Sequence, residues 1–131
     1  MELKIGMSFE VNGVVTRENT AKAVGSSDLP VFATPMMMAM MESAAAQCAA
    51  QFLDEGMTTV GISIQSSHDA ATPVGMKVRA VATITGLDRR RIEFSVEAYD
   101  ECGRIGAGVH SRFIVQAQPF LEKANAKLQR D

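Results

Sequence analysis

Three side chains in this sequence could together transfer protons or attack a carbonyl: Thr34, Glu42 and His68. Glu42 is the single charged residue between Pro35 and Leu53, a stretch rich in methionine and alanine. A lone carboxylate there is costly unless it is paired or used chemically. A hydroxyl, a carboxylate and an imidazole together can carry out acyl transfer or hydrolysis. The same residue types also fit a structural ion pair between Glu42 and a core histidine.

The stretch from Pro35 to Leu53 is predicted to be a long, largely buried helix. Thr34 stands immediately before Pro35 in a common type of helix opening, so Thr34 could serve simply as the helix cap. Gly56 predicts where the helix ends. A narrow polar stripe on this helix comprises Ser43, Gln47 and Gln51. Because Glu42 lies roughly 140° from the centre of that stripe, at about 100° per residue, it is not part of the solvated face.

Five segments are predicted to be strands: 8–17, 60–68, 76–85, 92–98 and 105–115. The first mixes β-branched and polar residues, and the other four alternate apolar and polar residues with the period of a strand. The first could instead be a bent hairpin around Asn12-Gly13. In the second, alternation places Val60, Ile62, Ile64, Ser66 and His68 on one face. His68 is thereby directed toward the core that the helix should occupy. One long helix and an antiparallel meander predict an α+β architecture, whereas a parallel sheet lacks the crossover helices that it would need.

Composition narrows the classes of function. The 131 residues, 47% of them hydrophobic, are expected to form one domain over 1–131. A net charge of -2 argues against a nucleic-acid partner. Two isolated cysteines, Cys48 and Cys102, predict no disulfide and no metal site, and the N-terminus lacks a signal-peptide pattern, so a cytoplasmic location is expected. The apolar helix is long enough to span a membrane, but its polar residues and many alanines argue against it.

Four short blocks of sequence, spread over most of the chain, match a pattern together. They are Val31-Phe32-Ala33-Thr34, Met41-Glu42, His68 with Ala70-Ala71-Thr72-Pro73, and Ile105-Gly106-x-Gly108-x-His110-x-Arg112. In combination they resemble the fluoroacetyl-CoA thioesterase family of hotdog-fold proteins. The resemblance implies a long central helix wrapped by an antiparallel sheet of about five strands. It also implies a homodimer with active sites near the subunit interface, which hydrolyses a small acyl-CoA thioester without a cofactor.

The resemblance also assigns roles to individual residues. The family's catalytic threonine, glutamate and histidine fall on Thr34, Glu42 and His68. Its glycine beside the bound thioester matches Gly61, whose missing side chain could let a substrate approach the backbone. Arg112 is likewise expected to contact the substrate. His110, on the same face as Arg112, is interpreted as structural or as part of the pocket rim.

Two departures from the family pattern bear on the substrate. The first turns of the helix are unusually rich in methionine, and the loop at 25–30 lacks the aromatic residues of the fluoroacetate-specific member. Fluoroacetyl-CoA is therefore not the expected substrate. Two mechanisms stay open: Thr34 attacks the thioester while Glu42 or His68 takes its proton, or Glu42 activates water that Thr34 positions. The alternative function is a noncatalytic module that binds acyl-CoA or another small ligand.

Overall fold

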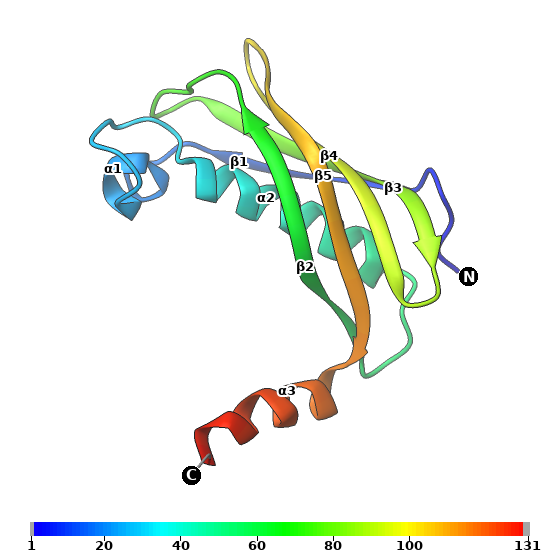
Figure 1. The fold of residues 1–131 in the computed structure, drawn as a ribbon. Coiled ribbons are helices and arrows are strands. Elements are labelled where there is room, and N and C mark those ends of the chain that lie inside the picture. The colour runs from blue at the N-terminus through cyan, green and yellow to red at the C-terminus, as the bar shows by residue number, and fades with distance from the viewer. Residues whose placement is uncertain (1, 130–131) are drawn as a thin grey trace.

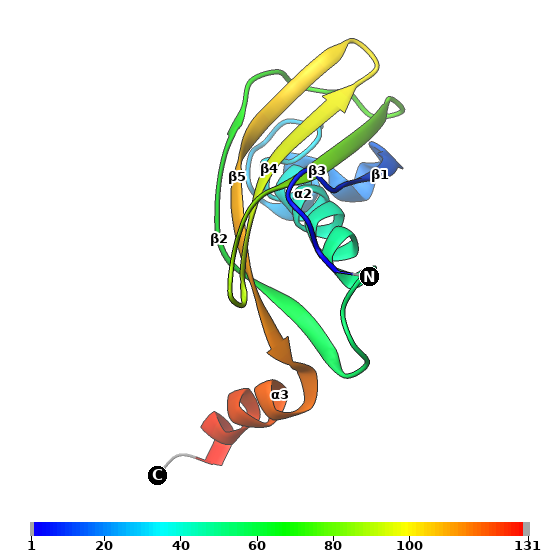
Figure 2. The same cartoon turned by 90° about the vertical axis from the view of Figure 1, so that its right-hand side faces the viewer.

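A five-stranded antiparallel sheet curves around one long helix in the computed structural model, which describes residues 2–129 (Figure 1). The strands are β1 (Ser8–Val14), β2 (Met57–His68), β3 (Lys77–Asp88), β4 (Arg91–Asp100) and β5 (Gly103–Gln116). Their order across the sheet is β1-β3-β4-β5-β2, so β1 and β2 form the two edges. Helix α2 (Thr34–Ala50) lies on the concave side of the sheet (Figure 2). The predicted α+β architecture is confirmed.

The core lies between α2 and the central strands. Alternate residues of β3 and β4 are buried against the helix, and the largest of them are Ile84, Ile92 and Phe94. Helix α2 contributes Met37, Met41, Ala44, Ala45, Cys48 and Ala49. These residues recur every three or four positions, as expected for one face of a helix. Burying a methionine side chain stabilises the fold by roughly 1.5–3 kcal/mol, and the small alanines let the helix approach the sheet closely.

The helix is shorter than the sequence indicates. It ends at Ala50, several residues before the predicted stop at Gly56. Gly56 instead has a φ of 86° in a turn in which the N–H of Met57 donates to the carbonyl of Asp54. This turn reverses the chain into β2, so the glycine serves the strand and not the helix.

The predicted alternation along β2 is correct for only part of the strand. The pairing of β2 with β5 shifts register between Gly61 and Ser63, as in a β-bulge. Ile62 is consequently 47% exposed, which contradicts its predicted position on the core face. From Ile64 to His68 the predicted alternation is confirmed, because residues pair regularly with β5 again. At the other edge, β1 is one continuous strand through Gly13, so the hairpin alternative is wrong.

Two short helices, η1 (Arg17–Asn19) and α1 (Ala21–Val24), connect β1 to α2 and were not predicted. The hydroxyl of Thr20 caps α1 by accepting from the N–H of Ala23, and Gly25 ends it with a φ of 83°. Isolated bridges from Thr20 to Phe32 and from Val31 to Pro73 hold this segment beside the end of β2. The segment therefore forms one wall near the start of α2.

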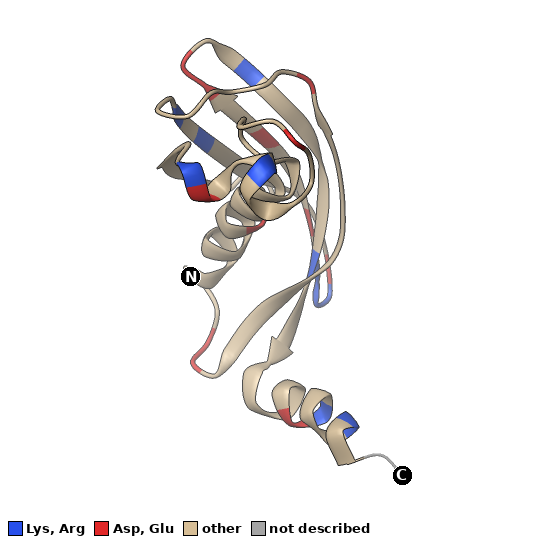
Figure 3. Ribbon diagram, turned by 90° about the vertical axis from the view of Figure 1, so that its left-hand side faces the viewer, with Lys and Arg blue, Asp and Glu red and all other residues tan. Residues whose placement is uncertain are grey.

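The C-terminal helices α3 (Ala117–Asn125) and η2 (Ala126–Gln129) project from the end of β5, away from the sheet (Figure 1). Neither buries a residue. Charged positions are interspersed over the short helices, the strands and this tail, whereas α2 is almost uncharged (Figure 3). Within residues 2–129, no helix has the length and apolarity needed to cross a membrane.

Candidate active site

Thr34 and His68 meet at the start of α2. The Oγ1 atom of Thr34 lies 2.7 Å from Nδ1 of His68, the last residue of β2. Thr34 is the first residue of the helix, and the cap position belongs to Ala33, which has no side-chain cap bond. The interpretation of Thr34 as only a helix cap is therefore wrong, because its hydroxyl is bonded to the imidazole. A hydroxyl in hydrogen-bond contact with a histidine is the geometry of an activated nucleophile.

Glycine in β5 allows this close approach. Gly106 pairs with His68 across the sheet, and a Cβ added there would lie 2.8 Å from Sδ of Met37 and 2.5 Å from the carbonyl oxygen of Ser67. The contact with the Ser67 carbonyl involves backbone, so a side chain at Gly106 would push β2 and β5 apart beside His68, whereas the end of the Met37 side chain could move aside. The glycine therefore helps to keep His68 in place beside Thr34.

A cavity of about 330 Å³ opens beside the pair. It is lined by Ala21, Ser26, Ser27, Val31, Phe32, Thr34, His68, Asp69, Ala70 and Ala71. Most of these side chains are small. The two reactive groups thus face an open space that could hold the reacting end of a ligand.

The imidazole of His68 is electrostatically suited to act as a base. Burial lowers its pKa, and the neighbouring charge of Asp69 acts in the opposite direction. Its Nε2 atom is buried and has no hydrogen-bond partner within the described part of the chain. A histidine with a lowered pKa is neutral at physiological pH, and its Nδ1 can then accept the proton of the Thr34 hydroxyl.

Glu42 belongs to a second group of polar residues. Its Oε2 atom lies 3.8 Å from Nη1 of Arg112, and its side chain is 44% exposed in the single chain. A Cβ added at Gly61 would lie 2.8 Å from this Oε2 and 3.3 Å from Nη1 of Arg112. The glycine thus provides the space that the carboxylate occupies over β2. The lone carboxylate of α2 is neither deeply buried nor paired with a histidine.

Hydrogen bonds to Thr59 on β2 fix the position of the Arg112 guanidinium. Only 7% of the residue is exposed, and its Nε donates to Oγ1 of Thr59 at 2.8 Å while Nη2 donates to the Thr59 carbonyl at 3.0 Å. Burial lowers the pKa of this guanidinium, and the charge of Glu42 opposes that effect. The sequence did not indicate Thr59, because its contact with Arg112 depends on how β2 pairs with β5, where Gly61 and not Thr59 lies opposite Arg112.

Within one chain, the structure separates the five predicted site residues into two groups. Thr34 and His68 form one, and Glu42, Gly61 and Arg112 form the other. No hydrogen bond or ion pair joins the groups among residues 2–129. Thr34 and Glu42 are eight residues apart on α2, which corresponds to about 12 Å along a helix axis.

Both cysteines are free thiols, Cys48 in the core and Cys102 at the surface. Burial raises the pKa of the Cys48 thiol, which is therefore unreactive. Within the described residues, no three His, Cys, Asp or Glu side chains are grouped so that they could hold a metal ion.

Comparisons with known proteins agree with one another. The family described as fluoroacetyl-CoA-specific thioesterase matches residues 15–118. A fluoroacetyl-CoA thioesterase from Streptantibioticus cattleyicolor is 38% identical over 98 residues, which cover 75% of this chain and 68% of the relative.

Two solved structures extend the comparison. A variant of the fluoroacetyl-CoA-specific thioesterase, in complex with fluoroacetate and CoA, superposes with a TM-score of 0.85 at 30% identity, covering 90% of this chain and 99% of that one. A hot-dog-like protein from Thermanaerovibrio acidaminovorans has a TM-score of 0.87 at 22% identity, covering 98% and 95%, and shows the shared fold. The chain has the hotdog fold and belongs to the family of fluoroacetyl-CoA-specific thioesterases.

Proposed function

We propose that this protein hydrolyses small acyl-CoA thioesters, with Thr34, His68 and Glu42 as its catalytic residues. The observation that carries the proposal is the 2.7 Å contact between the Thr34 hydroxyl and Nδ1 of His68 beside an open cavity. The chain belongs to a family of thioester hydrolases, which supports thioester hydrolysis as the reaction of Thr34 and His68. The cavity of about 330 Å³ beside this pair is large enough to admit part of a ligand.

In the proposed mechanism, Thr34 is the nucleophile. Its oxygen bonds to the thioester carbonyl carbon while its proton passes to Nδ1 of His68. The tetrahedral intermediate collapses by breaking the carbon–sulfur bond, and the proton on His68 neutralises the departing thiolate of CoA. In the second half, Glu42 takes a proton from water, and the water oxygen bonds to the acyl carbon of the acyl-threonine ester. The bond from that carbon to the Thr34 oxygen breaks, the oxygen takes back a proton from the protonated Glu42, and the acid is freed.

The negative charge that develops on the carbonyl oxygen needs donors that are already in place. Amides in the first turn of a helix have no partner within the helix. In α2 the N–H groups of Thr34 and Met36 are such donors, whereas Pro35 has none. They lie next to the proposed nucleophile, so the start of α2 is suited to stabilise the oxyanion.

A homodimer would complete the site. Strand β2 is an edge strand with a free pairing side, and Ile62 on it is 47% exposed. Antiparallel pairing of two β2 strands about a twofold axis between Ile64 and Gln65 would place Gly61 opposite the partner subunit's His68. Glu42 of one chain would then face the Thr34–His68 pair of the other. Gly61 and Arg112 would adjoin the thioester in this arrangement, which is the substrate-binding role proposed for them.

The setting proposed for the enzyme is the cytoplasm. Both cysteines are free thiols, which supports a reducing compartment. The whole chain is proposed to act as one domain in each subunit.

Release of free thiol from a panel of acyl-CoA thioesters tests the proposed function. We expect turnover with acetyl-CoA and other short thioesters, and a loss of about 10²-fold or more in Thr34→Ala, His68→Ala and Glu42→Ala. Two exposed residues of the same types, Thr85 and Glu55, provide matched alanine controls that should retain full activity.

Further measurements distinguish a Thr34 nucleophile from water activation by Glu42 and from a noncatalytic binding module. Mass spectrometry of rapidly quenched wild-type enzyme should detect the acyl group on Thr34. Full turnover in Thr34→Ala would exclude the nucleophile and leave water activation by Glu42. Absence of thiol release with every chain length, together with retained acyl-CoA binding, would favour the noncatalytic module.

A further inference from the structure

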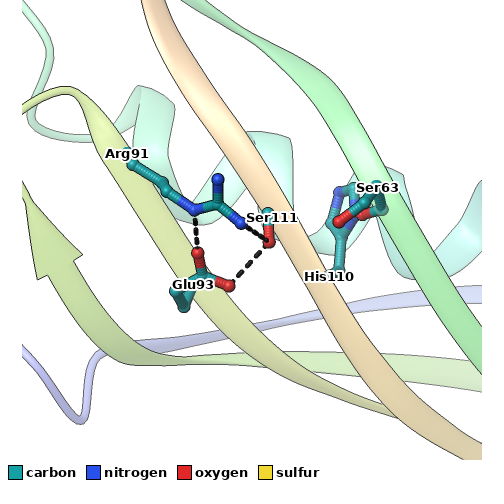
Figure 4. A network of polar contacts seen from close by, with 5 residues as sticks. All are labelled: Ser63, Arg91, Glu93, His110 and Ser111. Carbon is teal, nitrogen blue, oxygen red and sulfur yellow. Dashed lines mark hydrogen bonds and ion pairs between the residues drawn. The ribbon is translucent and has the colours of Figure 1, made fainter.

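His110 is the most deeply buried ionisable group near Glu42, and the proposed mechanism does not use it. The residue is 1% exposed, and its ring stacks on Phe94 with centroids 6.1 Å apart. Its Nδ1 lies 2.7 Å from the carbonyl oxygen of Ser63 on β2, beside which Figure 4 shows it. A carbonyl can only accept, so Nδ1 must carry the proton. The imidazole therefore has a fixed position and a fixed tautomer.

The opposite nitrogen of His110 is consequently an acceptor. Its Nε2 lies 3.2 Å from Nη1 of Arg112, which can only donate. Burial lowers the pKa of His110, and the charge of Arg112 lowers it further, while the hydrogen bond to Ser63 and the charges of Glu42 and Glu93 oppose the shift. The ring is thus neutral, as its bond to a guanidinium requires.

The charges around this ring come from three elements. Arg112 lies beside it on β5, Glu42 reaches it from α2, and Glu93 belongs to β4. Glu93 accepts from Ser111 at 2.6 Å and pairs with Arg91 in a separate network (Figure 4). Ser111 follows His110 directly on β5, so the two side chains point to opposite faces of the sheet. Arg112 and Glu42 are therefore the charges that share the face of His110.

Within residues 2–129, all the hydrogen bonds of the Arg112 guanidinium go to neutral acceptors. Thr59 accepts from Nε and Nη2, and His110 accepts from Nη1. The Nη1 atom is also the one that faces Glu42, yet it stops 3.8 Å from Oε2, beyond hydrogen-bond range. A guanidinium without these restraints would form the shorter, stronger paired contact with a carboxylate. His110 thus competes with Glu42 for the same donor.

We infer that His110 is a positioning residue that holds Arg112 beside Glu42 without letting the two form a direct hydrogen bond. This inference rests on the proposed role of Glu42 in activating water. A carboxylate in a close, two-point contact with arginine would have both oxygens engaged and would be a poor proton acceptor. A carboxylate beside the held cation keeps a free oxygen for water.

A matched pair of substitutions tests the inference. His110→Leu fills similar space without an acceptor, whereas His110→Gln can present an oxygen to Nη1 of Arg112. We expect His110→Leu to lower kcat by about tenfold, part of the 10²- to 10⁴-fold that a positioned acid–base group contributes, with KM unchanged. His110→Gln should retain most of the wild-type kcat. In a crystal structure of His110→Leu, Nη1 of Arg112 should bond directly to Glu42.

A double-mutant cycle separates positioning from a general structural role. If His110 acts through Arg112, the effect of His110→Leu on kcat should disappear in an Arg112→Gln background. Equal kcat losses in both backgrounds, or equal losses in His110→Leu and His110→Gln, would overturn the inference. Glu42→Gln in the same assay distinguishes this failure from that of the proposed function. Full kcat in Glu42→Gln would reject the role of Glu42 itself, whereas a loss there with a normal His110→Leu would reject only the positioning role.

Discussion

The hydroxyl of Thr34 and the imidazole of His68 form a donor–acceptor pair only while His68 is neutral. Burial favours the neutral form, and the adjacent Asp69 favours the charged form. The balance lowers the pKa of His68 below its ordinary value of about 6.5. The environment of this one side chain therefore extends the acidic range over which the pair can work.

A pH profile of kcat/KM should report this shift. The base form of His68 is the active one, so activity should be constant as pH falls past about 6.5 and should decline only below the lowered pKa. The decline should approach tenfold per pH unit, as expected for a single required base. Steady-state rates from pH 4.5 to 8 with acetyl-CoA would measure the inflection.

Asp69→Asn assigns that inflection to His68. Removing the Asp69 charge should lower the pKa further and move the inflection to still lower pH. Asp54→Asn, at an exposed position near the opposite end of β2, is the matched control and should leave the profile unchanged. If the pH of the inflection is the same in Asp69→Asn as in the wild type, a group other than His68 causes the decline in kcat/KM.

Gly61→Ala should disturb the second group of residues in the site. The new methyl would lie 2.8 Å from Oε2 of Glu42, so the carboxylate must move, although the backbone of Gly61 does not have the positive φ that would itself exclude alanine. A displacement of about 1 Å in a catalytic group can cost 10²-fold in rate. We expect a loss of that order in thiol release with little change in the unfolding midpoint.

Gly13→Ala is the control for Gly61→Ala. An added Cβ at Gly13 would meet Met40 at 3.7 Å and Val78 at 3.9 Å, both ordinary contacts. This variant should keep wild-type activity. Normal thiol release in Gly61→Ala would mean that the observed position of Glu42 is not the one used in turnover.

At the scale of elements, the apolar and polar pattern of the sequence predicted the long helix and most of the strands. The apolar run from Pro35 predicted α2, and the helical angle between Glu42 and Ser43 correctly separated the carboxylate from the polar stripe. Ser43 is exposed and hydrogen-bonded to Gln47 at 3.0 Å, while Glu42 faces β2 and β5. Period-two alternation predicted the strands that bury one face. These features follow from side-chain burial within single elements, which a sequence displays directly.

Pairing between distant elements was less predictable. The register shift after Gly61 depends on how β2 meets β5. An isolated glycine inside a strand is a sign of a bulge, but it does not by itself give the register on either side. Gly56 looked like a helix stop because the same left-handed conformation serves helix ends and turns. Residue types and positions indicated Thr34, Glu42 and His68, and the family resemblance assigned their roles and added Gly61. The division of the site residues into two groups follows from the three-dimensional arrangement of α2 and β2. The contacts of Arg112 with Thr59 and His110 likewise required the three-dimensional register.

At the scale of the whole molecule, the single chain presents two incomplete halves of a site. One contains Thr34 and His68, the proposed nucleophile and base, and the other contains the Glu42 carboxylate beside the Arg112 cation. The free edge of β2 lies next to both, because Gly61 and His68 belong to that strand. If two copies pair there, each proposed site takes Thr34 and His68 from one subunit and Glu42 from the other.

Heterodimers of inactive variants test that arrangement. A heterodimer of His68→Ala with Glu42→Ala, isolated with two affinity tags, would contain one site with all three residues and one site without two of them. It should recover about half of the wild-type activity per dimer, as a symmetric dimer with independent sites requires. A heterodimer of Thr34→Ala with His68→Ala is the matched control and should stay inactive, because both residues come from the same chain. Inactivity of the first heterodimer would instead place all three residues in one subunit.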